Sequence, residues 1–170
     1  AYDLNIKIFN KMQHTITGWP AGKPNADDSN RPERADIPKK RIIIFSPHPD
    51  DDVISMGGTF DRLVEQGHEV HVAYQTSGNI AVSDEDALKF AEISLALNLN
   101  SEEPKTLINF LKHKTDQDID SHEILRLKAL IRRSESLAAT RYLGLEDSSV
   151  HFLNLPFYET GTVKKNNITT

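Results

Sequence analysis

The sequence predicts an α/β domain with a mainly parallel sheet, because strand-like apolar runs alternate with amphipathic helical segments. Residues 41–46 form a short, continuous run rich in isoleucine, as expected for a parallel strand that is buried on both faces. Residues 52–66 have the apolar spacing of a helix, and residues 69–75 form a second strand-like run. A strand, a helix and a strand within about 35 residues match the size of a βαβ unit.

The first 40 residues differ in composition from the rest. Leu4, Ile8 and Met12 are spaced four apart, which predicts a short helix over residues 3–16. Residues 18–40 are rich in Pro, Gly, Asn and Asp and almost empty of apolar side chains, so we expect a linker or a surface arm. The predicted division is therefore an arm at 1–40 and a domain at 41–170. A linker so early suggests a chain cut from a longer polypeptide.

Further helices are expected after the second strand. Ser83 with Asp86 has the pattern of a capping box, and a longer helix is expected to start at Asp120 with Glu123 as its capping partner. This longer helix should end before Gly144, a residue typical of helix ends. The remaining predicted elements are a helix at 102–112 and a third strand at 150–155.

Composition and charge limit the class of protein. A length of 170 residues suits one domain, and the net charge of −5 argues against nucleic-acid binding, which needs a basic surface. No apolar run approaches the roughly 20 residues that span a bilayer, and the first residues lack the pattern of a signal peptide. The absence of cysteine excludes disulfides and thiolate metal sites and favours a reducing compartment. We expect a cytoplasmic protein without nucleic-acid or membrane partners.

The segment at 46–52, Ser-Pro-His-Pro-Asp-Asp-Asp, carries the most chemical information. It follows the first predicted strand, and ligands of open α/β sheets bind beyond the carboxyl ends of the strands. Imidazole and carboxylate groups are zinc ligands, and catalytic zinc usually takes three protein ligands and a water. His48 and one carboxylate could therefore chelate zinc while a neighbouring carboxylate faces the bound water. Such an arrangement produces a hydrolytic nucleophile.

Two simpler interpretations compete with a zinc site. The aspartates could be capping and first-turn acids of the following helix, which its dipole favours. They could also bind magnesium and phosphate in a different α/β enzyme, although His48 shifts the preference towards zinc. Gly57 and Gly58 cost about 2 kcal/mol of helix propensity, which suggests that backbone or ligand approaches closely there. No glycine-rich nucleotide-binding pattern is present, so nicotinamide, flavin and nucleoside triphosphate sites are not expected.

Several motifs together resemble those of the LmbE-like (PIG-L) zinc-dependent deacetylases. They are Pro-His-Pro-Asp-Asp at 47–51, Gly-Gly-Thr at 57–59, Gly-His-Glu-Val at 67–70, Thr-Ser-Gly at 76–78, Arg-Arg-Ser-Glu at 132–135 and Leu-Gly-Leu at 143–145. The resemblance covers roughly residues 41–160. It implies a Rossmann-like three-layer fold, bound Zn²⁺ and removal of the N-acetyl group from a small N-acetylglucosamine-type amino sugar.

The resemblance also implies roles for individual residues. His48 and Asp51 correspond to zinc ligands, and Asp50 corresponds to the general base. Arg132 corresponds to the arginine that helps to hold the sugar, and Asn79 stands at a substrate-contacting position where the family commonly has glutamate. Without the resemblance, the arginines of this predicted helix would be taken as a solvated face, and Arg133 is expected to be a surface residue.

The sequence departs from the family pattern at the metal site. Asp52 stands where the family usually has glutamate, and no histidine follows His151, whereas the family's third ligand comes after the third predicted strand. His151 itself is expected to be a half-buried sheet residue. We therefore expect two of the three zinc ligands, weak zinc binding and impaired activity in a domain truncated at its C-terminus. The chain also resembles the C-terminal region fused to some bacterial glucosamine-6-phosphate deaminases, so a non-catalytic amino-sugar-binding or regulatory module is the alternative.

Overall fold

The computed structural model describes residues 2–13, 39–97, 99 and 102–156. In these residues the strands are β1 (Arg41–Ser46), β2 (Glu69–Tyr74) and β3 (Val150–Phe152), and the helices are α1 (Tyr2–Gln13), α2 (Asp51–Glu65), α3 (Asp84–Ala96), α4 (Glu102–His113) and α5 (His122–Tyr142). Two single turns of 3₁₀ helix, η2 (Asn79–Ala81) and η3 (Asp147–Ser149), precede α3 and β3. None of the helices in these ranges has the length and apolar character that a membrane span requires.

The chain divides into two compact units. The first unit comprises residues 1–46, 50–73 and 139–151, and the second comprises residues 47–49, 74–138 and 152–170. The predicted N-terminal helix is confirmed as α1. The predicted arm lies for the most part at residues 14–38, outside the described residues.

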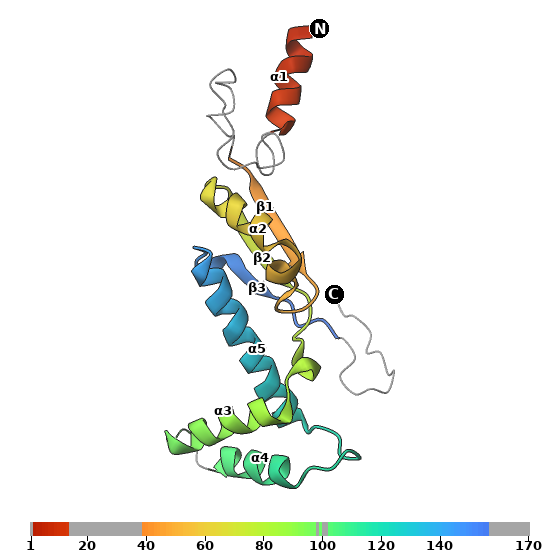
Figure 1. The fold of residues 1–170 in the computed structure, drawn as a ribbon, viewed down its shortest axis with the longest axis vertical. Helices are drawn as coiled ribbons and strands as arrows, with labels where there is room; N and C mark the ends of the chain where they lie inside the picture. Colours follow the sequence, from red (N-terminus) through yellow and green to blue (C-terminus); the bar gives the residue numbers. More distant parts are fainter. Residues whose placement is uncertain (1, 14–38, 98, 100–101, 157–170) are drawn as a thin grey trace. The chain divides into compact units, whose positions relative to one another are not determined.

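The sheet has the strand order β1-β2-β3 (Figure 1). The Glu69 N–H donates to the Lys40 carbonyl at 2.8 Å, and the Thr76 N–H donates to the Pro47 carbonyl at 3.1 Å. The partners advance by seven residues on each strand, so β1 and β2 run parallel. With α2 between them in the chain, they form the predicted βαβ unit. The α/β, Rossmann-like fold class is therefore confirmed.

The core of the first unit lies where α2 packs on the sheet. Its buried apolar side chains include Phe60 and Leu63 from α2 and Val70 and Val72 from β2. The expectation that β1 is buried on both faces is wrong. Ile44 is buried, but Ile43 and Phe45 are 53% and 63% exposed, because β1 is an edge strand with one face covered by the described residues.

In the second unit, α3 and α4 pack against each other and against the beginning of α5. Buried Ala87, Leu111 and Ile124 form their shared core. The predicted capping box is confirmed at the start of α3, since the Ser83 hydroxyl accepts from the Asp86 N–H at 3.0 Å and donates to the Asp86 carboxylate at 2.7 Å.

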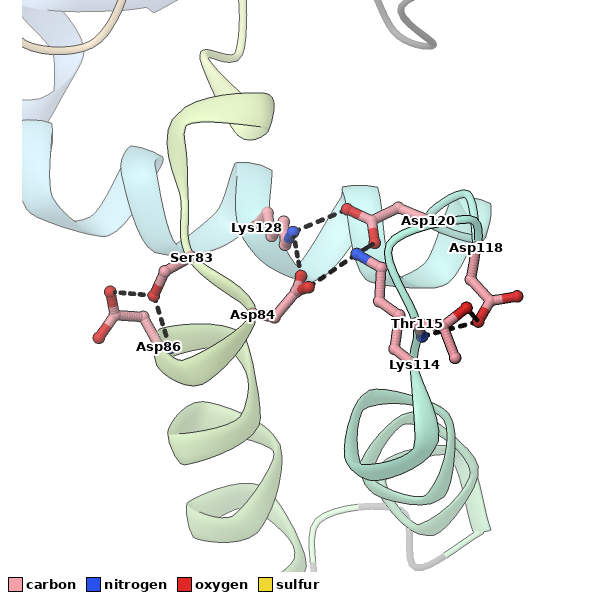
Figure 2. Close-up of polar contacts among 8 residues, drawn as sticks. All are labelled: Ser83, Asp84, Asp86, Lys114, Thr115, Asp118, Asp120 and Lys128. Carbon is pink, nitrogen blue, oxygen red and sulfur yellow. Dashed lines mark hydrogen bonds and ion pairs between the residues drawn. The ribbon is translucent and has the colours of Figure 1, made fainter.

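The prediction that the longest helix starts at Asp120 is wrong. Helix α5 begins at His122, and the Ser121 hydroxyl accepts the Ile124 N–H at 3.4 Å. The Asp120 carboxylate is instead part of a lysine–aspartate cluster with Asp84, Lys114 and Lys128, in which opposite charges alternate (Figure 2). An ion pair with two lysines leaves this aspartate unsuited to capping.

The third strand is shorter than predicted. β3 ends at Phe152, because Asn154 has φ +48° and leaves the extended conformation. The pairing nevertheless continues, since the Leu153 and Leu155 N–H groups donate to the carbonyls of Tyr74 and Gln75 at 2.9 and 2.8 Å. These bonds advance together along both segments, so β3 runs parallel to β2.

Candidate metal and substrate site

The turn between β1 and α2 is fixed by a buried polar contact. The Asp52 N–H donates to the Ser46 hydroxyl at 3.0 Å, and this hydroxyl lies 3.3 Å from the Asp52 carboxylate to which it donates. Both residues are at most 2% exposed. Asp52 therefore has a structural role: it ties the first turn of α2 to the end of β1. Asp52 is also the residue that stands where the family usually has glutamate, so this departure affects a structural position.

Asp50 and Asp51 begin α2, and Asp50 does not behave as an ordinary capping acid. Asp50 occupies the N-cap position, where its carbonyl accepts the N–H groups of Val53 and Ile54 at 3.0 and 2.9 Å. Its side chain makes no capping hydrogen bond. The interpretation of the aspartates as capping acids therefore does not hold for the Asp50 carboxylate. Asp51 is the first residue of α2 and is half-buried.

His48 belongs to the second unit, where it lies between two anchored prolines. The Thr76 N–H and hydroxyl both donate to the Pro47 carbonyl, at 3.1 and 2.8 Å. Gly78 has φ +63°, and a Cβ atom there would lie 2.9 Å from Pro49 Cδ. This position therefore requires glycine.

Arg132 of α5 packs against the same glycine. A Cβ on Gly78 would lie 3.3 Å from Arg132 Nε, so the arginine packs against the residue that precedes Asn79. The structure thus brings together the segment that carries His48, the turn that carries Asn79, and Arg132 of α5. Asp50 and Asp51 belong to the first unit and follow Pro49 directly in the chain.

A small cavity of about 160 Å³ lies in the second unit beside this loop. Its lining includes Pro49, Ser77 and Asn154, which follow β1, β2 and β3 respectively. Helix α5 contributes Arg126, Ala129, Leu130 and Arg133, and β3 contributes Phe152. The location agrees with the rule that ligands bind beyond the carboxyl ends of parallel strands.

Sequence reasoning missed two arginines of this cavity. Arg133 is exposed, as expected of a surface residue, but it also lines the cavity, with its guanidinium 4.1 Å from the centre of the Phe152 ring. Arg126 was not singled out at all. The available signal was their seven-residue spacing, which places both side chains on one face of a helix.

The expected close approach at Gly57 and Gly58 is not observed. A Cβ on Gly57 would be in ordinary contact with Val53 at 3.7 Å, and one on Gly58 would meet nothing within 4 Å. The glycines instead follow Met56, whose φ of −145° interrupts the helix. They line a hollow of the first unit, with a volume of about 560 Å³.

Other histidines make contacts away from the motif. His68 is buried and accepts the Lys40 N–H at 3.1 Å, and the His113 ring nitrogen lies 2.8 Å from the Asn109 carbonyl. The ring nitrogens of His71 and His151 lie 3.1 Å apart, and His151 is exposed rather than half-buried, because its side chain stands on a sheet face that the described residues leave open to solvent.

The motif's donor chemistry can be tested against zinc. Within the described ranges, no group of three or more His, Asp or Glu side chains is arranged to hold a metal ion. The imidazole of His48 and the carboxylate of Asp51 are nevertheless ligand types that zinc takes. The donor types fit zinc, and a further ligand is needed to complete the usual set of three.

The fold and the motif define an α/β domain with a histidine- and aspartate-bearing loop after its first strand, and comparison with known proteins specifies the family. Residues 43–170 match the PIG-L family, described as GlcNAc-PI de-N-acetylase, and the chain belongs to this family. A Bacteroides thetaiotaomicron protein with the provisional name glucosamine-6-phosphate deaminase-like protein is 58% identical over 177 residues. The match takes in 99% of this chain but 27% of the relative, so the chain spans about a quarter of that protein. No solved structure gives a significant match.

Proposed function

We propose that this chain carries the metal-binding segment of a zinc-dependent N-deacetylase that acts on an N-acetylglucosamine-type sugar or its phosphate. Membership of the PIG-L family supports this class of reaction. The observation that carries the proposal is the convergence of the His48 loop, the Ser77–Asn79 turn and Arg132 beyond the ends of parallel strands.

The residues have distinct roles in the proposed reaction. His48 and Asp51 would hold a zinc ion, which would supply a water of lowered pKa. Asp50 would act as the general base: its carboxylate would take a proton from the attacking water and pass it to the leaving nitrogen. The C–N bond breaks, and the products are acetate and the free amine. Arg132 and Asn79 hold the sugar by hydrogen bonds to its oxygen atoms.

A phosphorylated sugar is the favoured form of the substrate. The Bacteroides relative carries glucosamine 6-phosphate in its name, and the cavity beside the His48 loop is lined by two arginines. The whole relative is far longer than this chain, so its activity is not transferred to this domain.

A non-catalytic amino-sugar-binding module is the second candidate. The observation in its favour is the cavity of the second unit, whose arginines can bind an anionic sugar without a metal ion. Such a module would bind the sugar through the same loop and arginine but would release no acetate.

Acetate release from N-acetylglucosamine and its 6-phosphate, with and without added zinc, tests the proposal. Asp50→Asn should lower the rate by at least about 100-fold, since general acid–base groups contribute about 10²–10⁴. Asp61→Asn is the matched control, because Asp61 is an exposed residue of the same helix outside the motif. Sugar binding without acetate release would favour the binding module. An undiminished rate in Asp50→Asn would contradict the role of this carboxylate.

A further inference from the structure

Two arginines of α5 are directed to one cavity by their spacing. Arg126 and Arg133 are seven residues apart, close to two helical turns, and both line the cavity of about 160 Å³. Ala129 and Leu130 lie between them on the same face and line it too.

The Arg133 guanidinium rests on an aromatic support. It lies 4.1 Å from the Phe152 ring centre, and this ring stacks on buried Tyr74 with the ring centres 5.1 Å apart. The Arg133 Cζ atom lies over the face of the ring, where the cation is attracted by the ring's π electrons. The support therefore restrains Arg133, and its guanidinium carries several N–H donors that can bond acceptor oxygens. An oriented side chain also loses less entropy when a ligand binds.

The lining of the cavity is cationic. The described residues around it include two arginines and no aspartate or glutamate, although the whole chain has a net charge of −5. Ser77 and Asn154 add a hydroxyl and an amide, which both can donate hydrogen bonds. Such a set of donors matches an anion with several acceptor oxygens, and arginine forms paired hydrogen bonds with phosphate.

The size of the cavity indicates how much of a ligand it holds. Pockets that enclose a whole small molecule usually measure about 300–1,000 Å³. A cavity of about 160 Å³ suits one group of a ligand. Pro49 lines it and is adjacent in sequence to His48 and Asp50, so a group bound in the cavity lies beside the His48 loop.

We infer that Arg126 and Arg133 form a phosphate subsite, which makes a phosphorylated amino sugar the substrate class of this domain. The inference rests on the proposed function for the identity of the sugar, but the anion subsite itself rests on the cavity. It assigns Arg126 and Arg133 a role in specificity, separate from the sugar-holding role of Arg132.

Equilibrium binding by titration calorimetry, without added metal, tests this inference on the 170-residue chain. The ligands are N-acetylglucosamine 6-phosphate, N-acetylglucosamine and inorganic phosphate. We expect the phosphorylated sugar to bind at least about tenfold more tightly than the free sugar, and inorganic phosphate to compete with it, because charge-assisted hydrogen bonds are lost without the phosphate. Added salt should weaken the binding of the phosphorylated sugar in particular.

Charge-removing variants locate the subsite. Arg126→Gln and Arg133→Gln should each reduce affinity for the phosphorylated sugar about tenfold and leave that for the free sugar little changed. Arg133→Lys should fall between wild type and Arg133→Gln, because lysine keeps the charge but not the paired donors. Arg141→Gln, an exposed arginine of the same helix paired with Asp147, should bind like the wild type. Thermal melts confirm that each variant is folded.

The outcomes separate this inference from the proposed function. Equal affinity for the phosphorylated and the free sugar would overturn the subsite. The same holds if Arg126→Gln and Arg133→Gln both keep the wild-type preference for the phosphorylated sugar. The chain could instead prefer the phosphorylated sugar through both arginines and yet release no acetate. This result would support the subsite and contradict the deacetylase. Acetate release at the same efficiency from both sugars, with no phosphate preference in binding, would leave the deacetylase standing and refute the subsite.

Discussion

Lys128→Met is expected to destabilise the second unit strongly, because Lys128 lies inside the lysine–aspartate cluster (Figure 2). Its ammonium nitrogen is 2.6 Å from the Asp84 carboxylate and 2.7 Å from that of Asp120, and its side chain is 5% exposed. Lys114 contacts the same two carboxylates from the segment after α4. The cluster therefore joins the start of α3, the end of α4 and the first turns of α5.

The magnitude follows from the burial of the partners. Removing one member of a buried ion pair costs about 3–5 kcal/mol, because the other charge remains without compensation. The Asp120 side chain is 14% exposed, but that of Asp84 is 42% exposed, and Lys114 still neutralises part of the charge. We therefore expect the lower end of the range, about 3 kcal/mol, which is a large share of the roughly 5–15 kcal/mol that stabilises a typical domain.

Urea unfolding monitored by circular dichroism measures this loss as a change in midpoint at constant slope. Lys105→Met is the matched control, because Lys105 forms an exposed pair with Glu102 on α4 and such pairs contribute at most about 1 kcal/mol. Adding Asp120→Asn to Lys128→Met should restore part of the loss, since the uncompensated charge is removed. The reasoning is refuted if Lys128→Met costs no more than Lys105→Met.

Three further perturbations test the site and the cluster. Ser46→Ala should lower the free energy of unfolding by about 1–3 kcal/mol, because the buried Asp52 N–H loses the hydroxyl that accepts it, and the urea midpoint measures this. Gly78→Ala should cost about 2 kcal/mol and weaken sugar binding, since φ is +63° and the new Cβ clashes, whereas Gly58→Ala, which meets nothing, should not destabilise. Burial alone would raise the pKa of Asp84, but hydrogen bonds from the two lysines of the cluster hold it below its usual value. Asp84 therefore contributes fully to stability above about pH 3.9, and this contribution is lost as the pH falls through the lower pKa of the folded state. When the urea midpoint is plotted against pH, Asp84→Asn should make its decrease at acidic pH less steep. An unchanged decrease would contradict this account.

Local chemistry explains which elements could be predicted from the sequence. The isoleucine-rich run of β1, the capping box of Ser83 and the helix end before Gly144, which has φ +89°, depend on near neighbours and are all observed. The exposure of Ile43 could not be predicted, because it depends on which faces of the sheet other segments cover.

The errors arose where a distant partner changes the role of a residue. Asp120 has the composition of a capping residue, but its lysine partners lie elsewhere in the second unit. The sequence also could not distinguish Asp52 from its neighbours, whereas the structure bonds Asp52 to Ser46. Arg133 was predicted only as a surface residue, because its contact with Phe152 joins segments that are distant in the sequence.

The zinc content of the purified chain and of three variants tests the central claim most directly. His48→Ala and Asp51→Ala remove the two proposed ligands, whereas His113→Ala removes a histidine whose ring contacts the Asn109 carbonyl on α4. We predict specific zinc binding that is lost in the first two variants and retained in His113→Ala, because two ligands cannot be reduced to one without losing chelation. Zinc binding that is unchanged in His48→Ala and Asp51→Ala would contradict a metal site in this motif.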